Sequence, residues 1–99
     1  MVRIHAHPLM KGYVYIIQSN KNKRYYIGSS TNPERRLIEF HNSKKVKATK
    51  YLIPWILKFT QEYETITLAR KVERRLKQMK SKLIIEKIIK NEQCTIKVN

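Results

Sequence analysis

The chain has 99 residues, and its 22 lysines and arginines against seven aspartates and glutamates give a formal net charge of +15 at pH 7. A chain of this length supports one domain with a modest core, because small domains bury only about 60 to 70% of their unfolded surface. The charge predicts a polyanionic partner, and nucleic acid is favoured over a membrane because no apolar run approaches the ~20 residues of a spanning helix and no segment resembles a secretory signal.

The N-terminal residues 1–11 lack a clear hydrophobic period and predict a flexible leader. His5 and His7 have no further ligand nearby, which favours surface histidines over a metal pair. Cys94 is the only cysteine, so an internal disulfide and a Cys-x-x-Cys zinc site are excluded and a reducing compartment is weakly favoured.

Two short runs of tyrosine and β-branched residues, 12–17 and 25–28, predict the facing strands of a hairpin around the polar stretch 19–23. A tight hairpin sets Tyr15 opposite Tyr26. In this register one side of the sheet is core and the other is aromatic and hydroxylated. The core side is expected to carry Val14, Ile16, Tyr25 and Ile27, and the other side Tyr13, Tyr15, Tyr26 and Gly28. Tyrosine is also an ordinary strand residue, which is the alternative explanation for any one of these rings.

Asn32 before Pro33 predicts a helix start, because asparagine caps free amides and proline tolerates the first helical position. The helix is expected to run to about Asn42. Arg36 lies near its buried border, whereas Arg35 either faces solvent or contacts nucleic acid.

A basic loop over 43–50 predicts phosphate contacts that position a nucleic-acid backbone without reading sequence. A solvated loop or a nuclear-localisation patch is the alternative. Residues 51–59 predict a third strand, in which Trp55 packs in the core rather than stacking on a base. The candidate phosphate-binding residues of the loop are Lys44, Lys45, Lys47 and Lys50.

Thr65 or Thr67 predicts the cap of a helix with apolar residues at steps of three and four. Glu73 falls beside that apolar stripe, where a carboxylate needs a cation. The cation is either the Lys77 ammonium at i+4 or a metal ion. Ser81 predicts the start of a last, strongly apolar and therefore packed helix, after which the chain adds a short strand or frays.

The order and spacing of these segments resemble the GIY-YIG nuclease domain, whose two motifs are represented here by Tyr13-Val14-Tyr15 and Tyr26-Ile27-Gly28. Arg36 stands ten positions after Tyr26, as the family's arginine does. The segment 69–77 is similar to the family's Ala-x-x-x-Glu-x-x-x-Lys helix, with Glu73 and Lys77 at the matching positions. The resemblance spans roughly 12–90.

The resemblance implies an α/β (α+β) fold, with a small three-stranded antiparallel sheet flanked by helices. The single domain is expected over 12–90, between the leader 1–11 and a C-terminal tail 91–99. One departure is Tyr13, which replaces the glycine that opens the first motif, although Gly12 lies one residue earlier.

The resemblance also implies a metal-dependent DNA endonuclease that leaves a 5′-phosphate and a 3′-hydroxyl. Glu73 would hold a single Mg²⁺ or Mn²⁺ on the scissile phosphate, and Arg36 would pair with a non-bridging oxygen. Tyr15 and Tyr26 would orient the water, with one serving as base or proton relay. Phe40 occupies the family's position one turn after the arginine, and His41 is offset from it by about 100° around an α-helix but is retained as a catalytic candidate. Lys77 is a candidate DNA contact.

Branched, flapped or nicked DNA is the expected substrate, because so small a module has little area for sequence readout. The alternatives are a noncatalytic nucleic-acid-binding module of the same fold and a basic adaptor that docks on an acidic protein. The sequence leaves open whether a protein partner targets the module to its substrate. The expected location is the cytoplasm or nucleoid, or the nucleus or a viral factory if the source is eukaryotic or viral.

Overall fold

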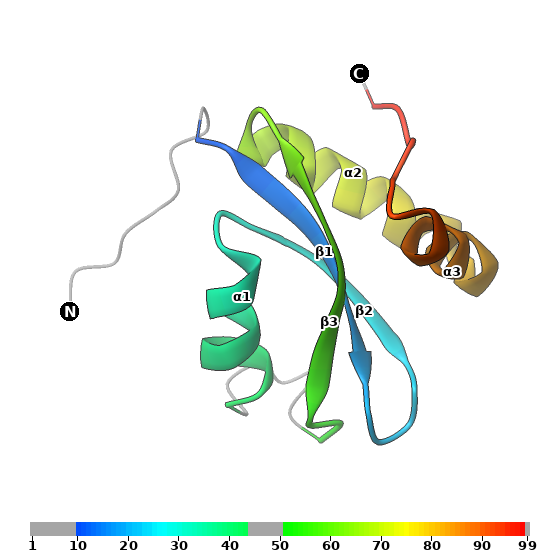
Figure 1. Ribbon diagram of the computed structural model, residues 1–99. Helices are drawn as coiled ribbons and strands as arrows, with labels where there is room; N and C mark the ends of the chain where they lie inside the picture. The colour runs from blue at the N-terminus through cyan, green and yellow to red at the C-terminus, as the bar shows by residue number, and fades with distance from the viewer. Residues whose placement is uncertain (1–9, 44–50, 99) are drawn as a thin grey trace.

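The computed structural model describes residues 10–43 and 51–98 as a three-stranded antiparallel sheet of order β2-β1-β3, packed between helices (Figure 1). The strands are β1 (Gly12–Ser19), β2 (Tyr25–Ser30) and β3 (Trp55–Tyr63). The helices are α1 (Pro33–Arg36), the π-helical turn η1 (Leu37–His41), α2 (Ile66–Met79) and α3 (Lys82–Asn91). The predicted fold class, α+β with a small antiparallel sheet flanked by helices, is confirmed.

The helix starts follow the predicted capping residues. The side chain of Asn32 accepts a hydrogen bond from the Arg35 amide, and those of Thr65 and Ser81 accept from the amides three residues ahead of them. Each cap satisfies an amide that has no partner inside its helix. Thr65, not Thr67, caps α2.

The predicted hairpin register is wrong by two residues: Tyr15 pairs with Gly28, and Tyr26 pairs with Ile17. The cause is the turn, in which the Ser19 hydroxyl accepts hydrogen bonds from two turn amides and the Ser19 amide donates to the Arg24 carbonyl. This wider turn moves the pairing along β2. The predicted division of side chains between the two faces survives, because only a shift by an odd number of residues exchanges the faces.

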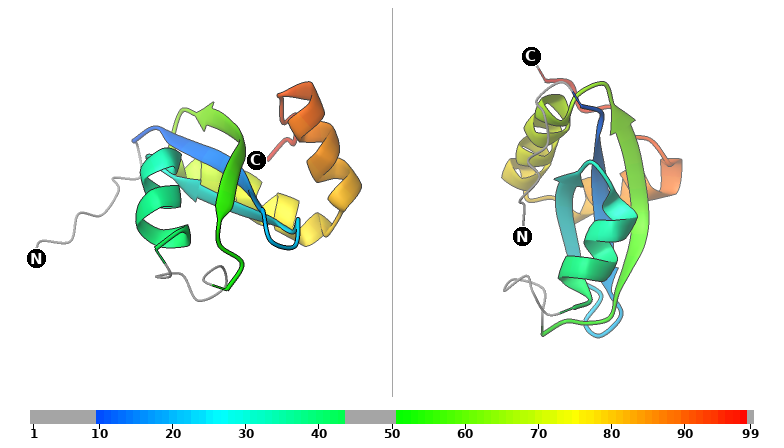
Figure 2. Two further views of the ribbon diagram at one scale, coloured as in Figure 1. Left: turned by 60° about the horizontal axis from the view of Figure 1, so that its bottom comes forward. Right: turned by 90° about the vertical axis from the view of Figure 1, so that its left-hand side faces the viewer.

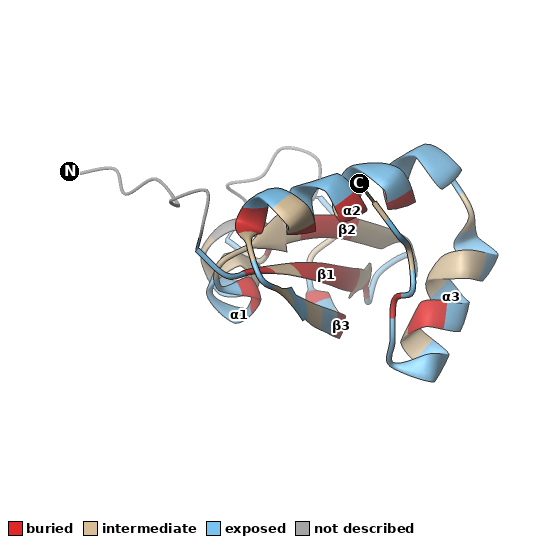
Figure 3. Cartoon of the chain, turned by 90° about the horizontal axis from the view of Figure 1, so that it is seen from above, coloured by how far each residue is buried: buried red, intermediate tan, exposed pale blue. Residues whose placement is uncertain are grey.

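Both faces of the sheet are covered, the core face and the aromatic face alike (Figures 2 and 3). On one face, residues of α2 and α3 pack against Val14, Ile16 and Ile27. On the other face, Tyr15 packs with Ile17, Trp55 and Leu37 of η1. Through this second cluster, η1 packs against the side of β1 that carries Tyr15.

β3 lies further along the chain than the predicted strand 51–59, and it pairs with β1 from Trp55 to Tyr63, with one register shift at Lys58. Pro54 has no amide hydrogen to donate to a ladder, so the strand begins after it. Trp55 is buried, which confirms its place in the core.

The last helix packs on one side only. Ile88 is buried, whereas Leu83 is 80% exposed, so the prediction of a packed helix holds for part of its surface. Beyond α3 the backbone of Cys94 forms two hydrogen bonds with the Gln61 side chain of β3. These bonds fasten the chain after α3 to the sheet without making an assigned strand.

Three expectations, for the leader 1–11, for its histidines and for the basic loop 43–50, concern segments that the structure does not describe or describes only in part. The histidines of the leader and the four lysines of the basic loop lie outside the described residues. Of the expected leader, Met10 and Lys11 are described: the Met10 carbonyl accepts a hydrogen bond from the Ile66 amide at the start of α2, and Lys11 forms an exposed ion pair with Glu62. Within 10–43 and 51–98, no helix is long and apolar enough to cross a bilayer.

Candidate active site at the edge of the sheet

A buried hydrogen bond joins Tyr15 of β1 to His41 at the end of η1, with 2.7 Å between the phenolic oxygen and Nε2. Tyr15 is 1% exposed and pairs with Gly28 of the neighbouring strand β2. A Cβ on Gly28 would overlap the Tyr15 ring and hydroxyl, so a glycine is required at this position. Two of the predicted site residues are therefore brought together, and the glycine of the second motif makes the room.

His41 reaches Tyr15 because the helix widens. The Asn42 amide bonds to the carbonyl of Leu37, five residues back, at 2.9 Å. A turn closed by such a bond holds more residues than an α-turn, so each residue rotates less around the axis. The expected 100° offset assumed an α-helix and was wrong for this reason. His41 lies close enough to Arg36 for the arginine's charge to act on the imidazole.

Asn42 ties this widened turn to the sheet. Its side-chain amide donates to the Trp55 carbonyl at 3.0 Å, and its side-chain oxygen accepts from the Trp55 amide at 2.6 Å. The first residue of β3 is therefore fixed to the end of η1. Sequence reasoning did not single out Asn42 for this role, because nothing local to it indicates a partner in β3.

Tyr26 stands between the histidine and the second helix. Its ring centre lies 4.9 Å from that of His41 and 6.3 Å from that of Trp55. The Lys77 ammonium lies 5.3 Å from the same ring centre, within the range of a cation–π contact. Tyr26 therefore links the residues of the helical turn η1 to those of α2.

Glu73 lies at the edge of β2, where its carboxylate has two partners. The Ser29 hydroxyl donates to Oε1, and the Lys77 ammonium lies 2.5 Å from Oε2. The ion pair with Lys77 is one of the two alternatives that the sequence left open. With its side chain 20% exposed, Glu73 still reaches the surface.

Basic residues surround this carboxylate. A cavity of about 540 Å³ is lined by Glu73 together with Arg70, Arg74 and Lys77, and Glu73 is its only carboxylate among the described residues. Sequence reasoning did not single out Arg70 and Arg74. The signal for Arg70 was available, because a residue three positions before Glu73 lies on the same face of a helix.

The environment sets the protonation of the Tyr15–His41 pair. Burial raises the pKa of the Tyr15 phenol above its ordinary value, and the charge of Arg36 opposes part of that rise. Burial, and then the charge of Arg36, lowers the pKa of His41 to about 4. At neutral pH the phenol therefore keeps its proton and the imidazole is neutral, so Tyr15 can donate and His41 can accept.

Arg35 lies on the exposed side of the first helix and forms a surface ion pair with Glu39, with 2.9 Å between Nε and Oε1. The structure does not bring it into the cluster of tyrosines. Such an exposed pair contributes little to stability, so it leaves the arginine available to an incoming phosphate. Its predicted DNA contact stays a prediction, as do those of Lys44, Lys45, Lys47 and Lys50.

Glu73 is the one predicted metal ligand, and the described part of the chain contains no group of three histidine, cysteine or acidic residues that could hold an ion. Mg²⁺ prefers oxygen ligands, keeps several waters and is often bound by one or two carboxylates together with substrate phosphates. A surface-reaching carboxylate beside the Ser29 hydroxyl fits an ion of that kind. Lys77 competes for one of the two carboxylate oxygens.

These contacts form one continuous chain, from Tyr15 through His41, Tyr26 and Lys77 to Glu73. In a comparison with protein families, the model described as the GIY-YIG catalytic domain matches residues 11–93. A comparison with curated proteins found no match.

Proposed function

The chain belongs to the GIY-YIG family of nuclease domains, and from this premise we propose that it is a divalent-metal-dependent endonuclease that cleaves branched, flapped or nicked DNA. The observation that carries the proposal is the contact chain from Tyr15 to Glu73. It connects two phenols, an imidazole and a carboxylate from the central strand β1 across the edge strand β2 to α2, with Arg36 beside the imidazole.

The basic residues of α2 support a place for the DNA backbone. Arg70, Arg74 and Lys77 border Glu73, and residues of this kind position a backbone through its phosphates. Arg36 would supply a guanidinium to the non-bridging oxygens of the scissile phosphate, where negative charge grows during the reaction. The net charge of +15 favours the approach of any nucleic acid.

The Tyr15–His41 pair supports a proton relay. The attacking water gives a proton to the Tyr15 oxygen as the phenolic proton moves to Nε2 of His41. This relay does not require Tyr15 to be ionised before the water attacks. Burial raises the pKa of the Tyr15 phenol, so the phenol keeps its proton at neutral pH. The negative charge of a bound phosphodiester opposes that of Arg36 and makes the imidazole a stronger base. Tyr26, whose ring centre lies 4.9 Å from that of His41, would orient the same water.

Glu73 would hold the Mg²⁺ or Mn²⁺, with the Ser29 hydroxyl keeping the carboxylate in place. The ion, when bound, supplies Lewis-acid stabilisation of the charge that develops on the phosphate oxygens. Lys77 would give up or share the carboxylate, which would make its ammonium available to a DNA phosphate.

Purified protein incubated with end-labelled branched, flapped, nicked and linear DNA, with Mg²⁺ or Mn²⁺, tests the proposal. Wild type is expected to cleave the non-linear substrates, and Glu73→Ala and Arg36→Ala to lose cleavage by a factor of about 10² or more while DNA binding persists. Lys58→Ala, on the opposite edge strand β3, is the matched control and should cleave as wild type does.

The ion pair of Lys77 with Glu73 is the specific observation that favours a second function, a noncatalytic nucleic-acid-binding module whose carboxylate is only structural. Binding without cleavage of any substrate under either metal would establish that function instead. Failure to bind DNA at low salt would reject both and favour an adaptor for an acidic protein.

A further inference from the structure

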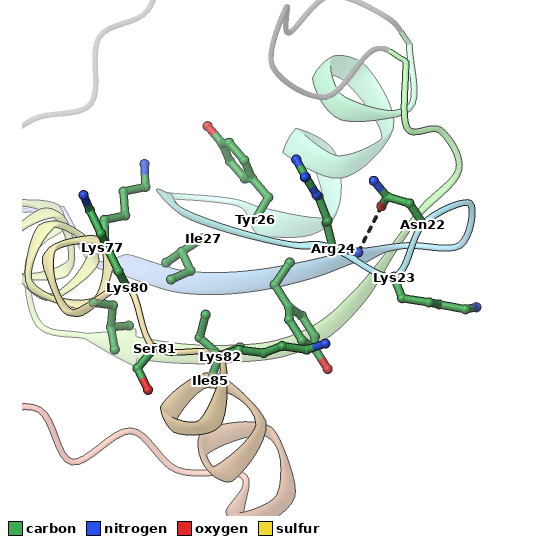
Figure 4. Close-up of a pocket in the computed structure, with 12 residues that line it drawn as sticks. Asn22, Lys23, Arg24, Tyr26, Ile27, Lys77, Lys80, Ser81, Lys82 and Ile85 are labelled. Carbon is green, nitrogen blue, oxygen red and sulfur yellow. Dashed lines mark hydrogen bonds between the residues drawn. The ribbon is translucent and has the colours of Figure 1, made fainter.

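A second cavity extends from the candidate active site around the edge of β2. It has a volume of about 420 Å³ and lies between the β1–β2 turn and the junction of α2 with α3 (Figure 4). At one end it is lined by Tyr26 and Lys77, which belong to the contact chain described above. At the other end it is lined by Lys82 and Ile85 of α3. We call this cavity the β2 groove.

The rim of the β2 groove is strongly basic. Lys23 and Arg24 line it from the turn, and Lys80 and Lys82 line it from the helix junction; all four are exposed. No acidic side chain of the described residues lines it. The rim therefore carries positive charge on both sides of the groove.

The floor of the groove is apolar and aromatic. Ile27 and Leu76 are buried in the core, Ile85 is partly buried, and the ring of Tyr25 lines the cavity beside them. A groove that only follows the phosphates of a duplex has no use for such a floor, because duplex bases are stacked against one another and not against the protein. An unpaired base presents its flat face, which aromatic side chains bind with little regard to sequence.

We propose that the β2 groove binds an unpaired DNA strand that continues from the scissile phosphate. The phosphates of this strand lie on the basic rim, and one of its bases lies on the floor beside Tyr25. The volume is in the range of pockets that enclose a small organic ligand, which suits a single nucleotide. This inference rests on the proposed nuclease function, because it assigns one part of the substrate, the single strand of a flap, to a place beside that site.

The test uses the double variant Arg24→Gln/Lys82→Gln, which removes one charge from each side of the rim. Neither side chain belongs to the contact chain from Tyr15 to Glu73. The matched control is Lys58→Gln/Lys87→Gln, which removes the same charge from exposed positions that do not line the groove. Thermal melting of both variants establishes that they remain folded.

Binding is measured in a Glu73→Gln background, so that the DNA stays intact, with a single-stranded oligonucleotide carrying the fluorescent adenine analogue 2-aminopurine. Its emission should fall on binding, because stacking on a tyrosine ring quenches it. The groove variant should bind about tenfold more weakly at low salt, lose most of the quenching, and reduce the slope of log K against log salt by about 1.4, at about 0.7 for each lost phosphate contact. The control variant should keep the quenching.

Cleavage gives the second measurement, with the flapped substrate compared against a nicked duplex that has no flap. The groove variant is expected to cleave the flapped DNA about tenfold more slowly and the nicked duplex within about twofold of wild type. Equal losses on both substrates would mean that the groove holds a duplex backbone and would overturn the inference. Equal losses in the control variant would also overturn the inference. An acidic peptide that displaces a weakly held oligonucleotide from the protein would overturn it as well.

The two measurements separate this inference from the function on which it rests. If wild type cleaves nothing, the proposed function fails, while quenching that depends on Arg24 and Lys82 still assigns the unpaired strand to the groove. If wild type cleaves but the strand is neither quenched nor sensitive to these two residues, the groove fails alone.

Discussion

The hydroxyl of Tyr15 and Nε2 of His41 lie 2.7 Å apart inside the protein, although 26 positions separate the two residues in the sequence. This bond spans from the central strand to the end of the first helical segment. It depends on three neighbours: Gly28, which leaves room for the ring, Asn42, which fixes the helical turn to β3, and Arg36, which acts on both groups by its charge.

Replacing Tyr15 by phenylalanine should remove the proton relay and leave the fold in place. Cleavage is expected to fall by a factor of about 10² to 10⁴, the usual contribution of a positioned acid or base. The unfolding free energy should fall by about 1 to 3 kcal/mol, because the buried imidazole loses a hydrogen bond. Single-turnover cleavage and urea unfolding measure the two effects.

Tyr13→Phe is the control for that variant, because Tyr13 is on the same strand and its hydroxyl bonds to Glu62 at the surface. It should cleave at the wild-type rate. A Tyr15→Phe variant that cleaves as fast as Tyr13→Phe would remove the relay from the mechanism.

Deleting Ile38 tests the role of the π-helical turn. Ile38 is 69% exposed, and its loss would place the histidine four residues after Arg36, one turn away in an ordinary α-helix. We expect cleavage within about tenfold of wild type and an α-helical turn in place of η1, because both geometries bring the imidazole to Tyr15.

The same deletion combined with replacement of the histidine by alanine provides the comparison. If the deletion alone already cleaves as poorly as the combined variant, the widened turn is essential and not an accommodation of one extra residue. Circular dichroism and the rate of flap cleavage are the measurements.

His41 should make stability depend on pH. Its pKa is about 4 in the folded protein against 6.5 for an ordinary histidine, so between these values the unfolded chain binds the proton more readily. Folding stability should therefore be fully present above pH 6.5 and be lost as the pH falls toward 4.

Urea unfolding of wild type and His41→Gln across pH 4 to 8 measures this contribution. The other two histidines of the chain are the same in both proteins, so the difference between the two isolates His41. The difference should grow with pH between about 4 and 6.5 and then level off. A difference that is flat over this interval would show that His41 is not buried in its neutral form.

Lys77 should compete with the metal for Glu73. Replacing it with methionine removes the ammonium that lies 2.5 Å from Oε2, so Mn²⁺ should bind more tightly. The gain is expected to be at most about fivefold, because a partly exposed ion pair is worth about 1 kcal/mol or less. DNA binding should weaken at the same time, since Lys77 lines both cavities and one cation is lost.

Mn²⁺ binding followed by electron paramagnetic resonance measures the first effect, and Arg74→Met is the control because it borders the cavity without an ion pair to Glu73 among those described. Equal Mn²⁺ affinities in wild type and Lys77→Met would place the ion elsewhere than on this carboxylate. Loss of Mn²⁺ binding in Glu73→Gln would complete the assignment.

Features that depend on residues close together in the chain could be predicted from the sequence alone. Asn32, Thr65 and Ser81 are followed within three residues by the amides that they cap, so the helix starts could be predicted. Period-two alternation assigned the strand residues to the correct faces. The spacing of Arg36 from Tyr26 and the position of Glu73 on α2 rest on the same kind of local information, together with the family resemblance.

Only the tertiary structure decided which of these residues meet. The hairpin register was set by the hydroxyl of Ser19 folding back on the turn, the place of His41 by one widened helical turn, and the partner of Glu73 by Ser29 on a strand far away in the chain. The Ser19 hydroxyl also donates to the distant Leu52 carbonyl, and the other two outcomes come from packing helices against both faces of the sheet. A side chain settles there by the space and the hydrogen-bonding partners that distant elements offer, and those partners are not encoded in the residues next to it.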